Sequence, residues 1–491
     1  MSAYLSIVRL TCRGAMRSHV FQFLLAVLLI GILIVPNTIK GDGSAYGYIQ
    51  VSLEYSLSFI SLMLMLTGIW LGCQTMTQDL EDNRIHMIVV KPVSRPVIWL
   101  GKFSGVMALL TVLLLISALA VYGFVTWQYK KAGLISEDGA QKEQGVASRE
   151  QQKIANEVLT GRRVYMPKLP DINKLINEEF TRQMSKTTPD GKRVLNVYTE
   201  EQRQKILQEI RRQVLSGLSE IKAGQIRLWE YEGLPKNYKG DFFVRYRVYT
   251  SSTSQTAEKV VGAWGAILFY EKMPDPANVK PGEKPVPELM TTYVTRKPEE
   301  ILTVSVNELE LPSENIIYDG KVTLGYANWS QKPVQFQLAD GPKVLIKHVS
   351  FLNNYFRAVF MEWLAVFVVT MIAFAAASFL SMPTAIFFTL SYLAFGSLAT
   401  FLQSPIKNYG SLAEMPAMDV YGYYLGEFLL FAVIPIQAFS VSELVANGEL
   451  IELSMIGNVF LWHVLVKGGI LALIGMYIYN RREFAMASVK R

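Results

Sequence analysis

The chain has 491 residues, of which 51% are hydrophobic and 18% are charged. This composition is too apolar for an ordinary soluble enzyme and too charged for a chain that lies in a membrane throughout, so membrane and aqueous parts must alternate. The formal net charge of +7 comes without a block of Lys and Arg, which argues against a nucleic acid as partner. Cys12 and Cys73, the only cysteines, lie in or beside apolar segments, so the polar part of the chain has none to form a disulfide.

Residues 1–19 have the pattern of an interfacial helix, in which three arginines, Arg9, Arg13 and Arg17, accompany apolar side chains. Such a helix lies on the membrane surface and reaches lipid phosphates or an acidic partner. An equally good interpretation is a positively charged anchor that only orients the first span.

Three apolar runs follow, at residues 20–36, 51–75 and 99–125, and each is long enough to cross a membrane. They form a membrane portion over residues 20–127. Glu54 lies at the outer end of the second run, where we expect it to be hydrated.

A polar segment, residues 77–98, separates the second and third runs. It opens with acidic residues, continues with an apolar side and ends at Pro92 and Pro96, which predicts a short helix lying flat against the bilayer. Its flanking basic residues include Arg84, Arg95 and Lys102, and the positive-inside rule then places it on the cytoplasmic side. A solvated connector between two helices is the alternative.

The order of this segment resembles the coupling region of permease subunits in type-2 ATP-binding-cassette transporters: an acidic-to-apolar helix, then Lys-Pro-Val-Ser-Arg, then Gly-Lys at the start of a span. The resemblance implies that the segment docks on a separate cytoplasmic ATPase subunit. The coupling residues would be Asp79, Glu81, Asp82, Arg84, Ile85, Met87 and Ile88, with Arg95 and Lys102 as cytoplasmic anchors.

The largest polar part of the chain follows the third run. Residues 128–230 are helical in pattern, with a capping box at Thr199 and Gln202 and a weaker helical pattern over 171–184. Residues 231–350 change to short β-rich runs separated by turns, which predicts an antiparallel β-sandwich. Its tryptophans, Trp229, Trp264 and Trp329, either fill the core or stack on a bound ligand.

Residues 351–480 return to the membrane, with spans at 356–379, 384–402 and 455–479. Arg357 and Glu362 are expected at the outer end of the fourth span, with their polar ends reaching the interface. The apolar stretch 421–441 is interrupted by glycines and Pro435, and we expect a re-entrant or interfacial element on the outer face. Residues 481–491 then form a cytoplasmic tail.

His463 and Lys467 lie inside the sixth span at a spacing of four residues. A charged side chain at that depth usually faces the protein interior or a cavity, so both are candidates for a pathway or for subunit packing. The sequence contains no phosphate-binding loop, metal-ligand cluster or nucleophile elbow, and we expect no catalysis and no cofactor in this chain.

The expected fold is therefore a polytopic α-helical membrane protein with six spans, a re-entrant or interfacial helix, and an inserted extracytoplasmic α+β domain containing the β-sandwich. The resemblance implies an exporter permease in the inner membrane, with cytoplasmic termini, that pairs with itself or a related permease. Whether the outer domain binds an envelope partner is left open by the sequence. The alternative is a membrane anchor or sensor whose sandwich binds a ligand. An ion-coupled transporter ranks last, because it would require several acidic groups deep within the spans and internal repeats, and the sequence shows neither.

Overall fold

The computed structural model describes residues 2–39, 44–81, 93–132, 144–187, 193–195, 199–236, 238, 240–250, 258–272, 288–338, 341–403 and 415–481. These residues divide into two compact units, a helical unit and a β-rich unit. The helical unit contains the described parts of 1–161, 349–408 and 415–491, and the β-rich unit those of 162–348.

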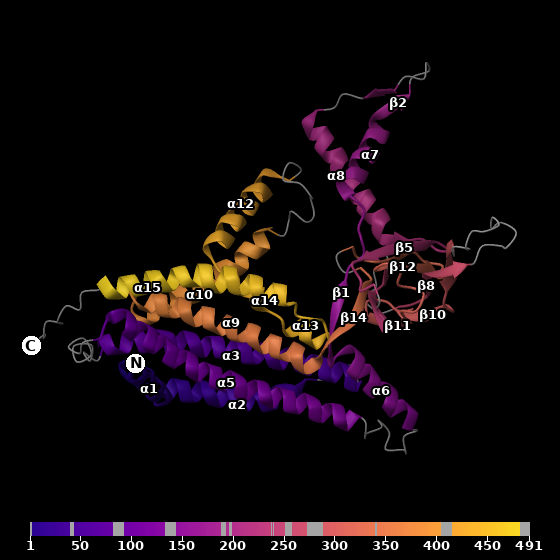
Figure 1. Cartoon of the computed structure of the whole chain (residues 1–491). Helices are drawn as coiled ribbons and strands as arrows, with labels where there is room; N and C mark the ends of the chain where they lie inside the picture. The colour runs from indigo at the N-terminus through magenta and orange to yellow at the C-terminus, as the bar shows by residue number, and fades with distance from the viewer. Residues whose placement is uncertain are drawn as a thin grey trace, which may run out of the picture. The chain divides into compact units, whose positions relative to one another are not determined.

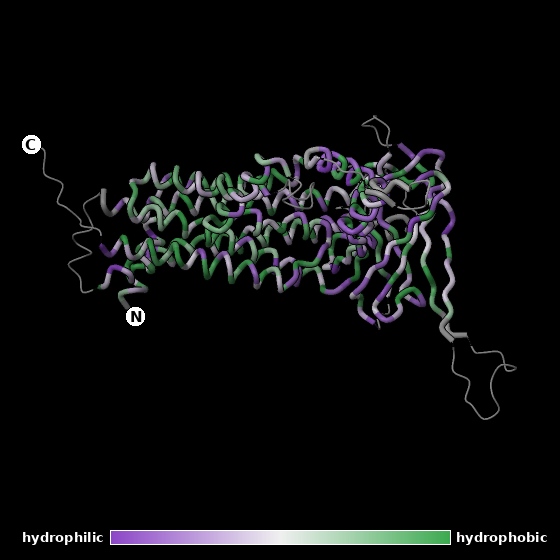
Figure 2. The backbone as a smooth tube through the Cα atoms, turned by 90° about the horizontal axis from the view of Figure 1, so that it is seen from above, coloured by the Kyte–Doolittle hydropathy of each residue, from purple (hydrophilic) through white to green (hydrophobic). Residues whose placement is uncertain are grey.

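The helical unit is a bundle of long apolar helices lying side by side (Figures 1 and 2). Its first half contains α1 (Ser2–Met16), α2 (His19–Thr38), α3 (Ala45–Glu81), α5 (Arg95–Ala132) and α6 (Gln144–Glu157). Its second half contains α9 (Phe351–Ala377), α10 (Met382–Gln403), α12 (Ala417–Ala432), η3 (Ile436–Phe439), α13 (Ser442–Ala446), α14 (Leu453–Val459), the π-helical η4 (Phe460–Gly468) and α15 (Gly469–Arg481).

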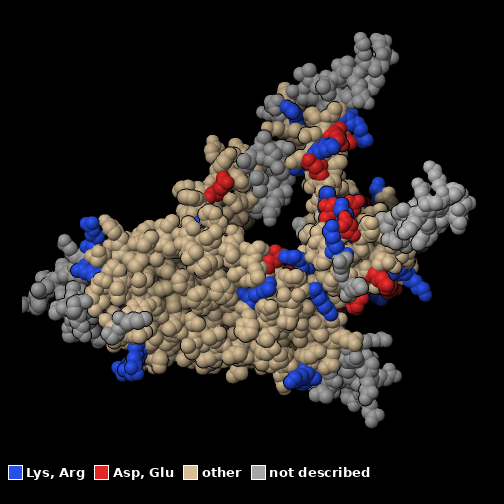
Figure 3. Space-filling model, viewed as in Figure 1, with Lys and Arg blue, Asp and Glu red and all other residues tan. Residues whose placement is uncertain are grey.

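Six of the described helical segments are long and apolar enough to cross a membrane, as the sequence predicted: α2, α3, α5, α9, α10 and the continuous segment from α14 to α15. Few charged side chains lie along the middle of this unit on the face shown in Figure 3. The chain is therefore a multi-pass membrane protein, because a helix needs about 20 apolar residues to cross the hydrocarbon layer.

The fourth span, α9, is the most buried of the six. Small residues let α3 approach α9 closely. Gly72 of α3 has no side chain, and Ala373 and Phe374 of α9 pack where a Cβ atom would be. Close approach through small residues is the usual way in which membrane helices associate. On the other side of the bundle, α1 packs against α5 near Gly101 and Gly105 and leaves its three arginines exposed.

The β-rich unit is built from two main sheets. The first has the order β1 (Thr160–Tyr165), β14 (Lys343–Ser350), β6 (Asp241–Arg247) and β11 (Val306–Pro312). The second has the order β10 (Glu299–Leu302), β8 (Lys259–Lys272), β12 (Lys321–Asn328) and β5 (Ile226–Glu232), with β9 (Glu288–Thr295) also paired to β8. Short ladders join β4 (Glu220–Ile221), β13 (Val334–Gln335) and β7 (Tyr249–Thr250), and β2 (Ser185–Thr187) with β3 (Arg193–Leu195).

Side chains from both main sheets form one hydrophobic core, and the predicted antiparallel β-region is confirmed. Trp229 and Trp264 belong to this core, with ring centroids 5.8 Å apart. Trp329 is 64% exposed and lies outside it. Of the three tryptophans, only Trp329 is therefore accessible to a ligand.

Two helices of the β-rich unit, α7 (Ile172–Met184) and α8 (Glu200–Ser219), pack against each other. The capping box predicted for α8 is present: the Gln202 backbone N–H donates to Thr199 Oγ1, and the Gln202 side chain accepts from the Thr199 N–H. Arg211 of α8 donates to Asn173 Oδ1 at 3.0 Å, which ties the middle of α8 to the start of α7.

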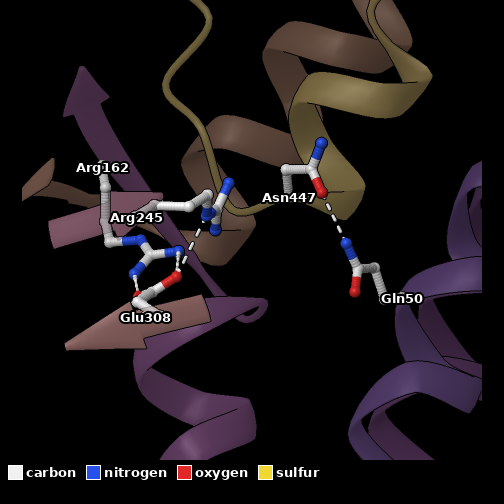
Figure 4. Close-up of polar contacts among 5 residues, drawn as sticks. All are labelled: Gln50, Arg162, Arg245, Glu308 and Asn447. Atoms are coloured by element: carbon white, nitrogen blue, oxygen red, sulfur yellow. Dashed lines mark hydrogen bonds and ion pairs between the residues drawn. The ribbon is translucent and has the colours of Figure 1, made fainter. Parts of the chain in front are cut away.

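A buried ion-pair cluster links three strands of the first sheet (Figure 4). Glu308 of β11 accepts from Arg162 of β1 and, at 3.0 Å, from Nε of Arg245 of β6. All three side chains are almost fully buried. A buried charge is tolerated only when it is paired, and this cluster connects β1 to β6 and β11 of the same sheet. No pattern in the sequence predicted β1.

Candidate functional site at the broken membrane element

The element between the fifth and sixth apolar segments is broken. The helix α12 ends at Ala432, and the chain continues through Val433 to Pro435 into η3 and α13 at a bend of 61°. Pro435 has no N–H and cannot continue the hydrogen bonding of α12. The interruption expected from the sequence is therefore present, and it leaves the last carbonyl groups of α12 without partners inside the helix.

Lys467 of η4 binds the broken end. Its ammonium group donates to the backbone oxygen of Leu430 and, at 3.0 Å, to that of Val433. These carbonyls lie at the negative end of the α12 dipole, where a cation is favourable. Tyr392 of α10 adds a second support, because its hydroxyl accepts from the Ile434 N–H at 3.1 Å and donates to the Ala432 oxygen at 3.3 Å.

The segment that presents Lys467 is itself irregular. Residues Phe460–Gly468 form a π-helix, a rare conformation that is frequently found at functional sites. The other predicted residue of this span, His463, lies in the same π-helix and contacts the Phe439 ring of η3 with centroids 6.0 Å apart. His463 and Lys467 thus contact the broken element on either side of its bend, and both make packing contacts.

The predicted coupling residues lie largely outside the described part of the chain. Residues 82–92 are not described, and α3 continues as one helix to Glu81, with the side chains of 79–81 also outside the described residues. The coupling set Asp79, Glu81, Asp82, Arg84, Ile85, Met87 and Ile88 therefore stays a prediction.

The two predicted anchors are described, and both bind backbone carbonyls. Arg95 donates to the Asn480 oxygen in the last turn of α15 at 2.8 Å, where a cation is favoured. Lys102 is buried, and its ammonium group donates to the Thr75 oxygen of α3 at 2.8 Å. These bonds tie the beginning of α5 to the last turn of α15 and to the C-terminal part of α3.

The expectation for the fourth span was wrong at Glu362. Its side chain is only 5% exposed, and its carboxyl accepts a hydrogen bond from Ser61 of α3. The reason is that α9 begins at Phe351, so Glu362 lies eleven residues, or about 16 Å, inside the helix rather than at its end. Arg357 donates to the Ile451 oxygen at 2.8 Å and is held by that contact.

No protein-family model, curated protein or solved structure matches this chain. Its function is therefore inferred from the residues and the geometry.

Proposed function

We propose that the chain is the permease subunit of an ATP-binding-cassette transporter, most simply an exporter, driven by a separate cytoplasmic ATPase subunit. The observation that carries the proposal is the broken element from α12 to α13, fastened by Lys467 beside six apolar helices. Irregular backbone at membrane depth is tolerated where it is buried in protein or lines a water-filled cavity, and discontinuous helices are typical of transport sites.

In this proposal the protein lies in the inner membrane with both termini in the cytoplasm and the β-rich unit outside. It pairs with itself or with a related permease. Residues 79–88 transmit nucleotide-driven movement of the ATPase to α3 and α5. The contacts of Arg95 with α15 and of Lys102 with α3 support this role, because they join the start of α5 to both neighbouring helices, so that movement of one would be passed to the others.

A second candidate function is a membrane-anchored sensor. The observation that favours it is an exposed apolar patch on β5, β8 and the chain after β12, formed by Ile226, Leu228, Val261 and Trp329. The Trp329 N–H donates to the Val261 oxygen at 3.0 Å, which places these two residues together. Contiguous exposed apolar side chains mark binding surfaces more often than isolated ones do.

Gentle purification of the tagged full-length protein from its own membrane distinguishes the two. We expect an ATPase subunit to co-purify with the wild type and to be lost from the double variant Glu81→Lys, Arg84→Glu. The matched control reverses two charges at the other end of α5, Lys130→Glu with Lys131→Glu, and should retain the ATPase. Absence of any ATPase under conditions that retain other bound proteins would favour the sensor.

A further inference from the structure

A polar stripe runs along the first half of α3. Gln50, Glu54, Ser58 and Ser61 recur at spacings of four, four and three residues, so they share one face of the helix. We call these four residues the α3 polar seam. The spacing of seven residues between Glu54 and Ser61 corresponds to about 10 Å along the helix axis.

The short helix α13 and the turn that follows it lie against the seam. Gln50 donates to the Asn447 side-chain oxygen (Figure 4), and the hydroxyls of Ser58 and Ser442 are 2.9 Å apart. Between these contacts the Glu54 and Glu443 carboxylates are close enough to repel each other. Glu443 is exposed and Glu54 is partly exposed, so both negative charges are accessible and attract cations, and we call this carboxylate pair the Glu54–Glu443 mouth.

The other end of the seam is Ser61, which donates to the buried carboxyl of Glu362 on α9. Glu362 is roughly 16 Å inside its span. An ionised carboxylate at such a depth is expensive, and acidic residues within spans usually mark proton or ion paths. The seam therefore joins an accessible pair of carboxylates to a single buried one through serine hydroxyls.

We propose that Glu362 is a membrane-embedded proton-binding site, which exchanges its proton with water at the Glu54–Glu443 mouth through the hydroxyls of Ser58, Ser442 and Ser61. A proton from water enters at the mouth. Each hydroxyl accepts one proton and releases another, and the last proton binds the Glu362 carboxylate to give a neutral carboxyl group. Ser58 and Ser61 are three residues apart, with Cβ atoms about 5–6 Å apart, a gap that one water bridges.

The other charged groups on elements packed against α9 have different contacts. His463 and Lys467 of η4 contact η3 and α12, and Arg95 and Lys102 of α5 bind backbone carbonyls. Arg357 of α9 binds the Ile451 oxygen, Lys131 lies over the Trp127 ring, and Arg481 lies over the Tyr477 ring. Among the described groups, Glu54 on the α3 polar seam and Glu443 on the facing helix α13 are thus the acidic ones on the route to Glu362.

Infrared spectroscopy of the full-length protein in lipid nanodiscs at neutral pH tests this inference. A protonated carboxyl group gives a C=O stretching band that shifts when its proton is exchanged for deuterium. We expect Glu362→Gln to remove one such band, while Glu427→Gln, which changes an exposed acid on α12, leaves it in place. Ser58→Ala combined with Ser442→Ala should keep the band and slow its exchange at least tenfold.

Two results would overturn the proposal. One is a spectrum with no band that Glu362→Gln removes, since the carboxyl would then not hold a proton. The other is an exchange rate that is the same in the wild type and in the serine double variant. Glu362→Asp keeps a carboxyl but draws it back by one methylene, so it should shift the band rather than remove it, and it provides a second test if the glutamine variant fails to fold. The inference rests on α3, α9 and α13 and does not require an ATPase partner.

Discussion

Lys467→Met tests the role of the ammonium group at the break. The substitution keeps an unbranched side chain of similar length and removes both hydrogen bonds to the α12 carbonyls. Each hydrogen bond between membrane helices contributes about 0.6–1.7 kcal/mol, so the loss should be roughly 1–3 kcal/mol. Because 1.4 kcal/mol is tenfold in an equilibrium constant, opening of the broken end should become about 5- to 150-fold more frequent.

The assay is hydrogen–deuterium exchange of the backbone amides of residues 430–440 in nanodiscs, read by mass spectrometry. Pro435 contributes no amide, and the neighbouring N–H of Ile434, held by Tyr392, is the most informative probe. The control is Leu465→Met, which changes an exposed side chain in the same π-helix. Exchange at these amides that is equal in Lys467→Met and in the control would refute the stabilising role of Lys467.

Three further predictions concern packing and charge. Glu308→Gln leaves Arg162 and Arg245 without their buried carboxylate, and it should lower the free energy of unfolding of the β-rich unit by about 3–5 kcal/mol in a denaturant titration. The control, Glu300→Gln at the exposed pair with Lys259, should have no measurable effect. Equal effects of the two variants would contradict a stabilising role of the buried cluster. Gly72→Leu should separate α3 from α9 and cost about 1–3 kcal/mol, seen as a lower Tm, while Gly123→Leu, which has open space, should not. Burial raises the pKa of Tyr246 to about 12 from 10.0, so its stabilising contribution is complete below pH 10 and is lost as the pH rises toward 12. Unfolding of the full chain followed by tryptophan fluorescence should therefore be less pH-dependent over that range in Tyr246→Phe, and an unchanged slope would contradict this.

Most of the fold could be predicted from the apolar runs and from local motifs such as the helix capping box. The apolar runs matched helices α2, α3, α5, α9 and α10, and the capping box at Thr199 marked the start of α8 within one residue. The strand β1 was missed because its sequence, Thr-Gly-Arg-Arg-Val-Tyr, places arginines where a buried strand usually has apolar residues. Arg162 is buried only because Glu308, 146 residues later, accepts its hydrogen bonds, and no local pattern contains that pairing.

The candidate site was predicted only in part, again because local sequence patterns do not contain contacts between residues far apart in the chain. A lysine inside an apolar span is visible in the sequence, and Lys467 was selected on that ground. Its partners are backbone carbonyls, which every residue has, so the sequence does not show which of them a helix break leaves open. Glu362 was misplaced because the start of α9 at Phe351 follows directly from β14, without a polar linker to mark the boundary.

The central claim, that this chain is a transporter subunit coupled to a separate ATPase, is tested most directly by native mass spectrometry of the complex extracted from its own membrane. The proposal predicts a mass equal to two permease chains, identical or related, with two bound ATPase subunits. A chain found alone, or bound only to envelope proteins under conditions that preserve known membrane complexes, would contradict it.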